Sequence, residues 1–167
     1  MGIFKSFGGA GSRFWKGKLM TIYVGADYRG FEKKQKLLEF LAKTNYEVVD
    51  LGAYENSEND FNDAAIAVAK AIRENRGAYG ILICDSAHGM TIQANRFKGI
   101  RAAHCGSVES AKLAREHDDA NILCLSAHFM DDATMYAVAE TFLTTDFVPL
   151  ERRVRRINRL DEREDYD

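Results

Sequence analysis

The fold is decided by Gly80-Ile81-Leu82-Ile83-Cys84, an apolar run that leads directly into the polar pair Asp85-Ser86. The run is continuously apolar and does not alternate with polar residues. Strands of a parallel sheet have this pattern when helices cover both faces. Ligands of such sheets bind beyond the carboxyl ends of the strands. The stretch therefore predicts a central strand that ends at a candidate functional loop.

Strand and helix patterns alternate on both sides of this run. Four further strands are predicted, at residues 21–25, 46–51, 99–104 and 121–125. Helices are predicted at about 29–43, 61–72, 89–97, 107–117 and 135–143. Strict alternation with short connections is typical of doubly wound sheets. We expect a single α/β domain with a three-layer, Rossmann-like (flavodoxin-like) fold and a five-stranded parallel sheet.

Composition narrows the class of protein. The chain has 167 residues, 46% of them hydrophobic, and a formal net charge of −2. This charge gives no reason to expect nucleic acid or an anionic membrane as a partner, and no apolar run approaches the roughly 20 residues that cross a bilayer. The three cysteines, Cys84, Cys105 and Cys124, form no CxxC pair. They favour a reducing, cytoplasmic location over a disulfide framework or a zinc site.

Both ends of the chain differ from the middle. Residues 1–19 are rich in glycine and carry basic and aromatic residues without a regular period, so we expect a flexible extension before a domain at 20–167. The segment from Leu150 onward predicts an arginine-rich helix. Its apolar stripe, which includes Val154 and Ile157, is thin. A thin stripe holds a helix weakly on its own chain, and we expect this helix to pack on a partner subunit.

Ordered motifs connect this chain to a known family. They are Gly25-Ala26-Asp27, the run 80–84 with Gly89-Met90 and Ala94-Asn95-Arg96-Phe97-Lys98-Gly99-Ile100-Arg101-Ala102-Ala103, then Arg115-Glu116-His117-Asp118-Asp119-Ala120-Asn121-Ile122-Leu123, and the arginines of 152–156. Together they resemble the signatures of the ribose-5-phosphate isomerase B and galactose-6-phosphate isomerase family. The resemblance extends from about Met20 to Ile157, which is nearly the whole domain.

The resemblance implies conversion of an aldose phosphate to a ketose phosphate through an enediolate, without a metal or another cofactor. Ribose 5-phosphate and ribulose 5-phosphate are the expected pair. By family position Cys84 is the base, His117 opens the sugar ring, and Ser86 and Asp27 complete the catalytic set. The residues alone also allow plainer roles. Cys84 could be a buried strand-end cysteine, His117 a helix cap and Asp27 a helix N-cap.

The resemblance also implies a phosphate site made by Arg152 and Arg156. Their i, i+4 spacing lets both guanidinium groups reach one anion, although a solvated arginine face has the same spacing. Asn95 is either a polar sugar contact or a helix-surface residue. Further substrate contacts are expected from Tyr28, Asp85, His88, Gly89 and Asp118. In this family the site is completed across a subunit interface, so a homodimer or a tetramer is expected.

The chain departs from the family pattern near the predicted base. The glycine-rich loop is here Asp85-Ser86-Ala87-His88-Gly89, with two glycine positions filled. Tyr28 replaces a histidine, Phe61-Asn62 replaces Tyr-Pro, and His128 stands where many members have arginine. A carboxylate at Asp85 is expected to raise the pKa of the Cys84 thiol and to oppose an anionic intermediate.

These departures from the family pattern also allow other functions. The chain could bind or sense a phosphosugar on the same fold without turning it over, or it could isomerise another sugar phosphate such as galactose 6-phosphate. A flavodoxin-like nucleotide or response-regulator domain shares the alternation of strands and helices. It is disfavoured because Gly25-Ala26-Asp27-Tyr28-Arg29-Gly30 lacks the Gly-x-Gly-x-x-Gly pattern.

Overall fold

The sheet has five parallel strands and confirms the predicted fold class. The structure, a computed structural model, describes residues 14–15, 18–55 and 59–162. The strands are β3 (Thr21–Ala26), β4 (Glu47–Asp50), β5 (Tyr79–Cys84), β6 (Ala102–His104) and β7 (Ile122–Ser126). They lie in the order β4-β3-β5-β7-β6. β5 is the central strand, as its uninterrupted apolar pattern predicts.

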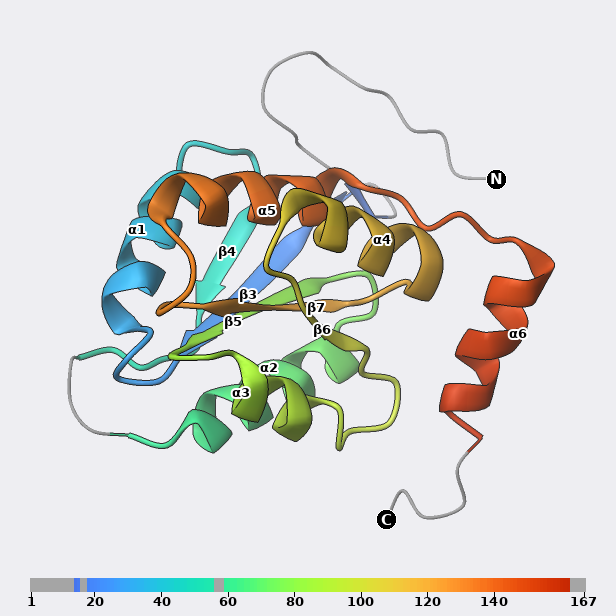
Figure 1. The fold of residues 1–167 in the computed structure, drawn as a ribbon, viewed down its shortest axis with the longest axis horizontal. Helices are drawn as coiled ribbons and strands as arrows, with labels where there is room; N and C mark the ends of the chain where they lie inside the picture. Colours follow the sequence, from blue (N-terminus) through green and yellow to red (C-terminus); the bar gives the residue numbers. More distant parts are fainter. Residues whose placement is uncertain (1–13, 16–17, 56–58, 163–167) are drawn as a thin grey trace.

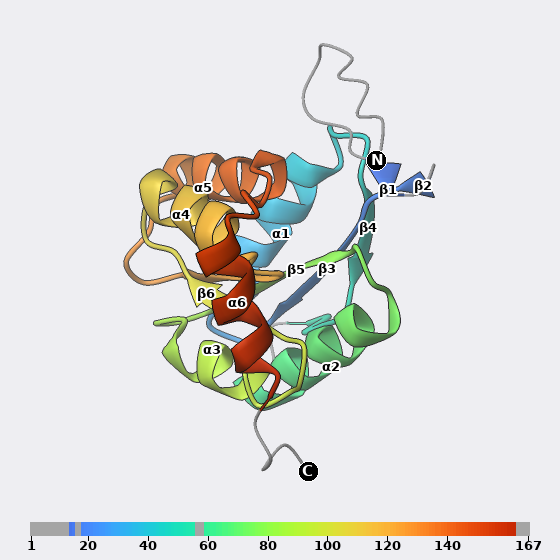
Figure 2. The ribbon, with the colours of Figure 1, turned by 90° about the vertical axis from the view of Figure 1, so that its right-hand side faces the viewer.

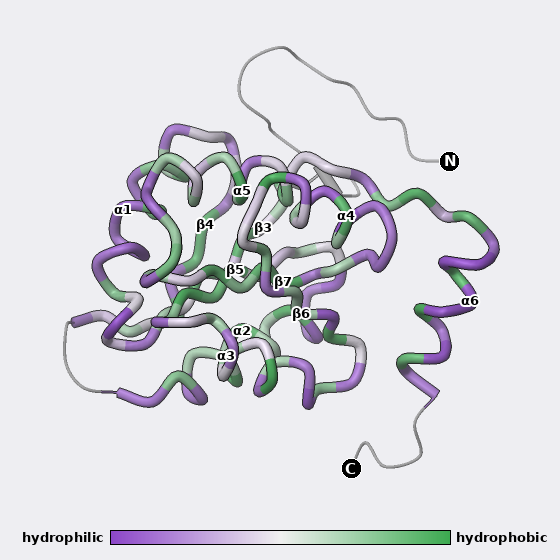
Figure 3. Tube along the Cα trace, in the orientation of Figure 1, coloured by the Kyte–Doolittle hydropathy of each residue, from purple (hydrophilic) through white to green (hydrophobic). Residues whose placement is uncertain are grey.

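Helices cover both faces of the sheet and make it the middle of three layers (Figures 1 and 2). One face is covered by α1 (Phe31–Leu41), α4 (Val108–Asp118) and α5 (Asp132–Thr144), and the other by α2 (Phe61–Glu74) and α3 (His88–Ala94). Apolar residues concentrate in the sheet, as Figure 3 shows. Each predicted element is present within a few residues of its expected ends.

The order of the strands places the candidate site. Counted in chain order, the five strands lie as 2-1-3-5-4, whereas the flavodoxin order is 2-1-3-4-5. The last two strands are thus exchanged, with β6 at the edge. The chain first moves to one side of β3 and then to the other, so the switch point lies between β3 and β5. The loops that leave these two strands begin at Asp27 and Asp85.

The C-terminal helix α6 (Glu151–Leu160) projects from the body of the protein (Figures 1 and 2). None of its residues is buried. Arg153 donates from Nη1 to the carbonyl of Glu116 at 3.1 Å, and Asp161 accepts from the amide of Gly99 at 2.9 Å. Val154 on its apolar stripe stays exposed. The packing of this helix on a partner subunit remains a prediction.

The N-terminal extension is described only in part. Residues Phe14–Trp15 form β1 and Lys18–Leu19 form β2, and these two short strands pair antiparallel, a hairpin that the sequence did not suggest. The rest of the segment expected to be flexible, residues 1–13 and 16–17, lies outside the described residues. In the described part of the chain, none of the helices combines the length and the apolar character needed to span a membrane.

Substitution of Gly30 tests how closely the turn after β3 packs on β5. A Cβ at this position would lie 2.2 Å from the carbonyl oxygen of Ile83, which is a backbone atom that cannot move aside cheaply. We expect Gly30→Ala to lower the free energy of unfolding by about 3 kcal/mol. Urea denaturation followed by circular dichroism measures this loss.

Gly106→Ala is the matched control, since nothing lies within 4 Å of a Cβ at Gly106. Its stability should stay within about 0.5 kcal/mol of the original chain. Equal stability of the two variants would contradict the close packing at Gly30.

Candidate active site

The turns that follow β3 and β5 meet at the carboxyl edge of the sheet. The amide of Asp27 donates to the carbonyl of Ile83 at 3.3 Å, and the Asp27 carboxylate accepts from the amide of Gly30 at 2.8 Å. Asp27 and Cys84 are only 6% and 4% exposed. These two residues therefore form a buried floor at the switch point, where the fold class places ligands.

The Cys84 thiol is held largely in its protonated form. Burial raises its pKa, and the negative charge of Asp27 raises it further. Backbone amides act in the opposite direction, and the Ala87 amide donates to Sγ at 3.2 Å. The amides at the start of α3 thus favour the thiolate, but burial outweighs them.

Asp27 also has a raised pKa. Burial is the largest cause, and the charge of Asp85 adds to it, whereas the amides of Gly30 and Arg29 lower the pKa. The carboxylate closes the turn before α1, but the N-cap of α1 is Gly30, so the expectation that Asp27 caps this helix is corrected. It also acts on Cys84 through its charge, so its position serves the fold and the site together.

Asp85 does not take the place expected for it. Its side chain is 45% exposed, with Oδ2 3.7 Å from Nη1 of Arg29 and Oδ1 3.8 Å from Nδ1 of His128. The carboxylate charge that raises the pKa of Cys84 is that of Asp27. The expectation that Asp85 would set the pKa of the thiol is therefore corrected, because Asp85 has a cationic partner at the rim of the site.

The loop after Cys84 keeps a backbone shape that glycine prefers. Ala87 has a φ of 69°, in the left-handed region that non-glycine residues rarely adopt. Ser86 is half-buried, and its hydroxyl accepts from the amide of His88 at 3.4 Å. The loop therefore holds its glycine-like conformation without a glycine at this position.

Aromatic side chains border the same loop. His88 is exposed and meets His104 edge to face, with the ring centroids 5.4 Å apart. Burial and the neighbouring His88 lower the pKa of His104. Gly89 lies against the ring of Phe61, because a Cβ at Gly89 would come within 2.8 Å of it. Phe61 thus packs against the loop at Gly89.

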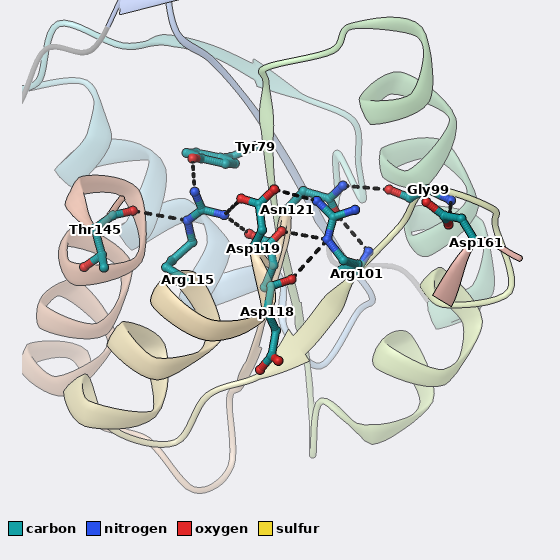
Figure 4. A network of polar contacts seen from close by, with 10 residues as sticks. Tyr79, Gly99, Arg101, Arg115, Asp118, Asp119, Asn121, Thr145 and Asp161 are labelled. Atoms are coloured by element: carbon teal, nitrogen blue, oxygen red, sulfur yellow. Dashed lines mark hydrogen bonds and ion pairs between the residues drawn. The ribbon is translucent and has the colours of Figure 1, made fainter. Parts of the chain in front are cut away.

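The second signature builds a turn at the opposite, amino edge of the sheet (Figure 4). Arg115 is 3% exposed and donates to the Asp119 carboxylate at 2.8 Å and to the carbonyl of Thr145 at 3.3 Å, with its guanidinium 4.5 Å from the Tyr79 ring centroid. Arg101 joins the network through Asp119 at 2.9 Å. The network fixes the end of α4.

The end of α4 carries His117 and Asp118. The side chain of His117 is half-buried and Asp118 is exposed. Because α4 follows β6 and runs back across the sheet, these residues lie at the edge opposite to Cys84. The signature therefore combines a structural network with two residues, one half-buried and one exposed, at the end of α4.

Asn95 and the predicted arginine pair also lie away from Cys84. The Asn95 amide donates to the carbonyl of Ala102 at 2.9 Å and accepts from its amide at 2.8 Å, so it braces the start of β6. Arg152 and Arg156 are exposed on α6. Within one chain, the structure brings together at the carboxyl edge Cys84, Asp27, Ser86, Tyr28, Asp85, His88 and Gly89. It separates from them His117, Asp118, Asn95, Arg152 and Arg156.

Three polar residues at the carboxyl edge were not predicted. Arg29 pairs with Asp85, and His104 meets His88 edge to face. Ser126 donates from Oγ to the carbonyl of Asp85 at 2.6 Å. All three lie at or just beyond the end of a strand, and this position is the signal that could have identified them. In the described residues, no three or more His, Cys, Asp or Glu gather in a way that could hold a metal ion.

The raised pKa of Cys84 predicts slow alkylation at neutral pH, with the pH midpoint above that of a free cysteine. Asp27→Asn keeps the acceptor for Gly30 but removes the charge, so the midpoint should move to lower pH. Mass spectrometry of peptides after iodoacetamide treatment measures it for each cysteine. Cys105 and Cys124, whose pKa values burial raises to about 11 and about 12, should react more slowly still. Rapid alkylation of Cys84 at neutral pH would contradict this account.

Comparison with known proteins identifies relatives of this chain. Residues 22–160 match the ribose/galactose isomerase family. Ribose-5-phosphate isomerase B of Mycobacterium tuberculosis is 36% identical over 146 residues, which cover 87% of this chain and 90% of the relative.

Solved structures agree as well. A ribose 5-phosphate isomerase of Thermotoga maritima has a TM-score of 0.83 and 38% identity, with 86% of this chain and 99% of that one covered. Ribose-5-phosphate isomerase B of Mycoplasma genitalium, solved with bound ribulose-5-phosphate, has a TM-score of 0.81 and 36% identity, with 85% and 94% covered. The chain therefore belongs to the ribose/galactose isomerase family and is a sugar-phosphate isomerase of the ribose-5-phosphate isomerase B type.

Proposed function

We propose that this enzyme interconverts ribose 5-phosphate and ribulose 5-phosphate through an enediolate, without a metal ion. The observation that carries the proposal is the position of Cys84, on the floor of the switch-point site with amides of the following turn directed at its sulfur. The relative from Mycoplasma genitalium, which was solved with ribulose-5-phosphate, supports this choice of sugar.

In the proposed reaction the Cys84 thiolate takes the proton from C2 of the open-chain aldose. The electrons of that C–H bond form the C1–C2 double bond, and the carbonyl electrons move to O1. The thiol then returns the proton to C1, and the hydroxyl proton passes from O2 to O1, which gives the ketose. The N-terminal end of α3 would stabilise the negative charge that develops on oxygen.

The catalytic and phosphate-binding groups that lie at the other edge would come from a second copy of the chain. We assign ring opening to His117 and phosphate binding to Arg152 and Arg156, all from the partner subunit. α6 supports this assembly, since it stands away from its own body with Val154 exposed. A homodimer would place two such sites symmetrically.

Replacement of the base tests the chemistry. Cys84→Ala should lower kcat for ribose 5-phosphate by about 10²–10⁴-fold, because a positioned base contributes that much. Turnover of the original enzyme should rise with pH through the neutral range, because the pKa of Cys84 is raised, and it should persist in EDTA. A coupled assay for ribulose 5-phosphate measures both.

Cys105→Ala is the control, as this cysteine is equally buried but lies on a different strand end. It should keep its turnover. An original enzyme that binds phosphosugars without isomerising any pentose or hexose phosphate would overturn the proposed reaction, and galactose 6-phosphate belongs in that panel.

The phosphate role of α6 predicts a change in affinity. Arg152→Gln and Arg156→Gln should each raise KM by about tenfold, since each loses a charged hydrogen bond to phosphate. Arg155→Gln on the same helix should leave KM unchanged. Equal effects of all three substitutions would point to a general effect of helix charge.

Mixing two impaired variants tests whether the site is shared. With ribose 5-phosphate well below KM, Cys84→Ala chains should be almost inactive and Arg156→Gln chains about tenfold slower than the original enzyme. Unfolded and refolded together, the two should regain about a quarter of the original rate, because half of the dimers are hybrids with one intact site each. No recovery despite hybrid formation would place the arginine and the cysteine in one chain's site.

A second candidate function is phosphosugar binding without turnover. It is favoured by the Cys84 thiol, which burial keeps protonated, and by the departures in the loop at residues 85–89. This candidate predicts saturable binding of ribose 5-phosphate that Cys84→Ala leaves unchanged, and the kinetic assay separates it from the isomerase.

A further inference from the structure

Arg29 stands at the mouth of the site above the buried pair of Cys84 and Asp27. Its Nε donates to the hydroxyl of Tyr28 at 3.0 Å, and the centre of its guanidinium is 5.6 Å from the centroid of the Tyr28 ring. These contacts hold one side of the guanidinium, and Nη1 on its other side lies 3.7 Å from Asp85, the residue that directly follows Cys84. Arg29 is therefore a positioned cation at the site.

The only ion pair of Arg29 within the described residues is loose. Nη1 lies 3.7 Å from the Asp85 carboxylate, and the two side chains are 57% and 45% exposed. Exposed pairs of this kind are weak and exchange readily with solvent or another anion. Both Nη groups can therefore turn to a better acceptor while Nε stays on Tyr28.

A phosphate monoester is such an acceptor. It carries up to two negative charges, whereas a carboxylate carries only one. Its paired oxygens also match the fork of a guanidinium. Asp85 directly follows Cys84 in the chain. An anion that replaces the Asp85 carboxylate at Arg29 therefore stays within the length of one sugar from the Cys84 sulfur. A neutral sugar hydroxyl would not displace the carboxylate in this way.

We propose that Arg29 binds the phosphate group of the sugar phosphate, with Tyr28 as its positioning residue and Asp85 as a carboxylate that competes for it. The inference rests on the proposed function only in taking a sugar phosphate as the ligand. It adds to the α6 arginines of the partner subunit a cation from the same chain as Cys84. Asp85 then holds Arg29 at the mouth while the site is empty.

The test uses two substitutions with effects of opposite sign. Arg29→Gln should raise KM for ribose 5-phosphate by about tenfold with little change in kcat, because ground-state binding is lost. Asp85→Asn should lower KM, since the competing carboxylate is gone. The double variant should resemble Arg29→Gln. Arg29→Lys should recover part of the affinity, and Arg73→Gln, an exposed arginine at the other edge of the sheet, should match the original enzyme.

Inorganic phosphate separates the phosphate group from the sugar. As a competitive inhibitor it should bind about tenfold more weakly to Arg29→Gln and more tightly to Asp85→Asn. Unphosphorylated ribose should bind all variants alike. Calorimetric titration gives the same comparison without turnover, so it remains decisive if the isomerase reaction itself fails.

Three outcomes would overturn the inference. They are an unchanged affinity for phosphate in Arg29→Gln, an equal loss of affinity for ribose and for ribose 5-phosphate, and KM changes of the same sign in Arg29→Gln and Asp85→Asn. A simple loss of local structure would produce the last of these. Turnover by the original enzyme alongside any of them would leave the proposed function standing.

Discussion

The contact between the turn after β3 and the end of β5 is the constraint on which the site depends. Asp27 reaches the backbone of Ile83 at 3.3 Å, and Gly30 packs so closely on the same carbonyl that no side chain fits. This contact buries the Asp27 carboxylate and brings its charge to bear on Cys84. It also places Tyr28 and Arg29 at the entrance. One backbone contact thus sets the floor, the charge and the rim of the site.

Burial of Cys84 has two consequences for an isomerase. The thiolate is scarce at neutral pH, because desolvation raises the pKa against the effect of the turn amides. Once formed, however, a thiolate of high pKa is a stronger base than one of low pKa, and proton abstraction from carbon needs a strong base. The same desolvation would strengthen every charge interaction with the proposed enediolate. The environment that limits the population of the proposed base therefore also increases its strength.

The sequence predicted the fold well because its pattern of apolar residues indicates which segments are buried. The uninterrupted apolar run 80–84 is the central strand, and the alternation fixed which loops reach the carboxyl edge. Prediction from the sequence failed where the position of a side chain depends on a partner from another loop. Asp85 was expected to raise the pKa of the Cys84 thiol, but Arg29 and His128, from two other loops, pair with it. The β1–β2 hairpin was missed because its residues have no regular period, and the pKa of Cys84 required the competing amides to be weighed against burial.

The separation of the two groups of residues constrains any mechanism. A strand of six residues, such as β5, spans about 20 Å, and Cys84 and His117 lie at opposite ends of the sheet. A pentose phosphate is much shorter than this distance. If both residues act on one sugar, His117 must therefore come from a second copy. A two-fold axis satisfies this requirement twice, because the contact that brings the first copy's α4 and α6 to the second copy's carboxyl edge also does the reverse. The projecting arginine helix and the incomplete site of the single chain then have the same explanation.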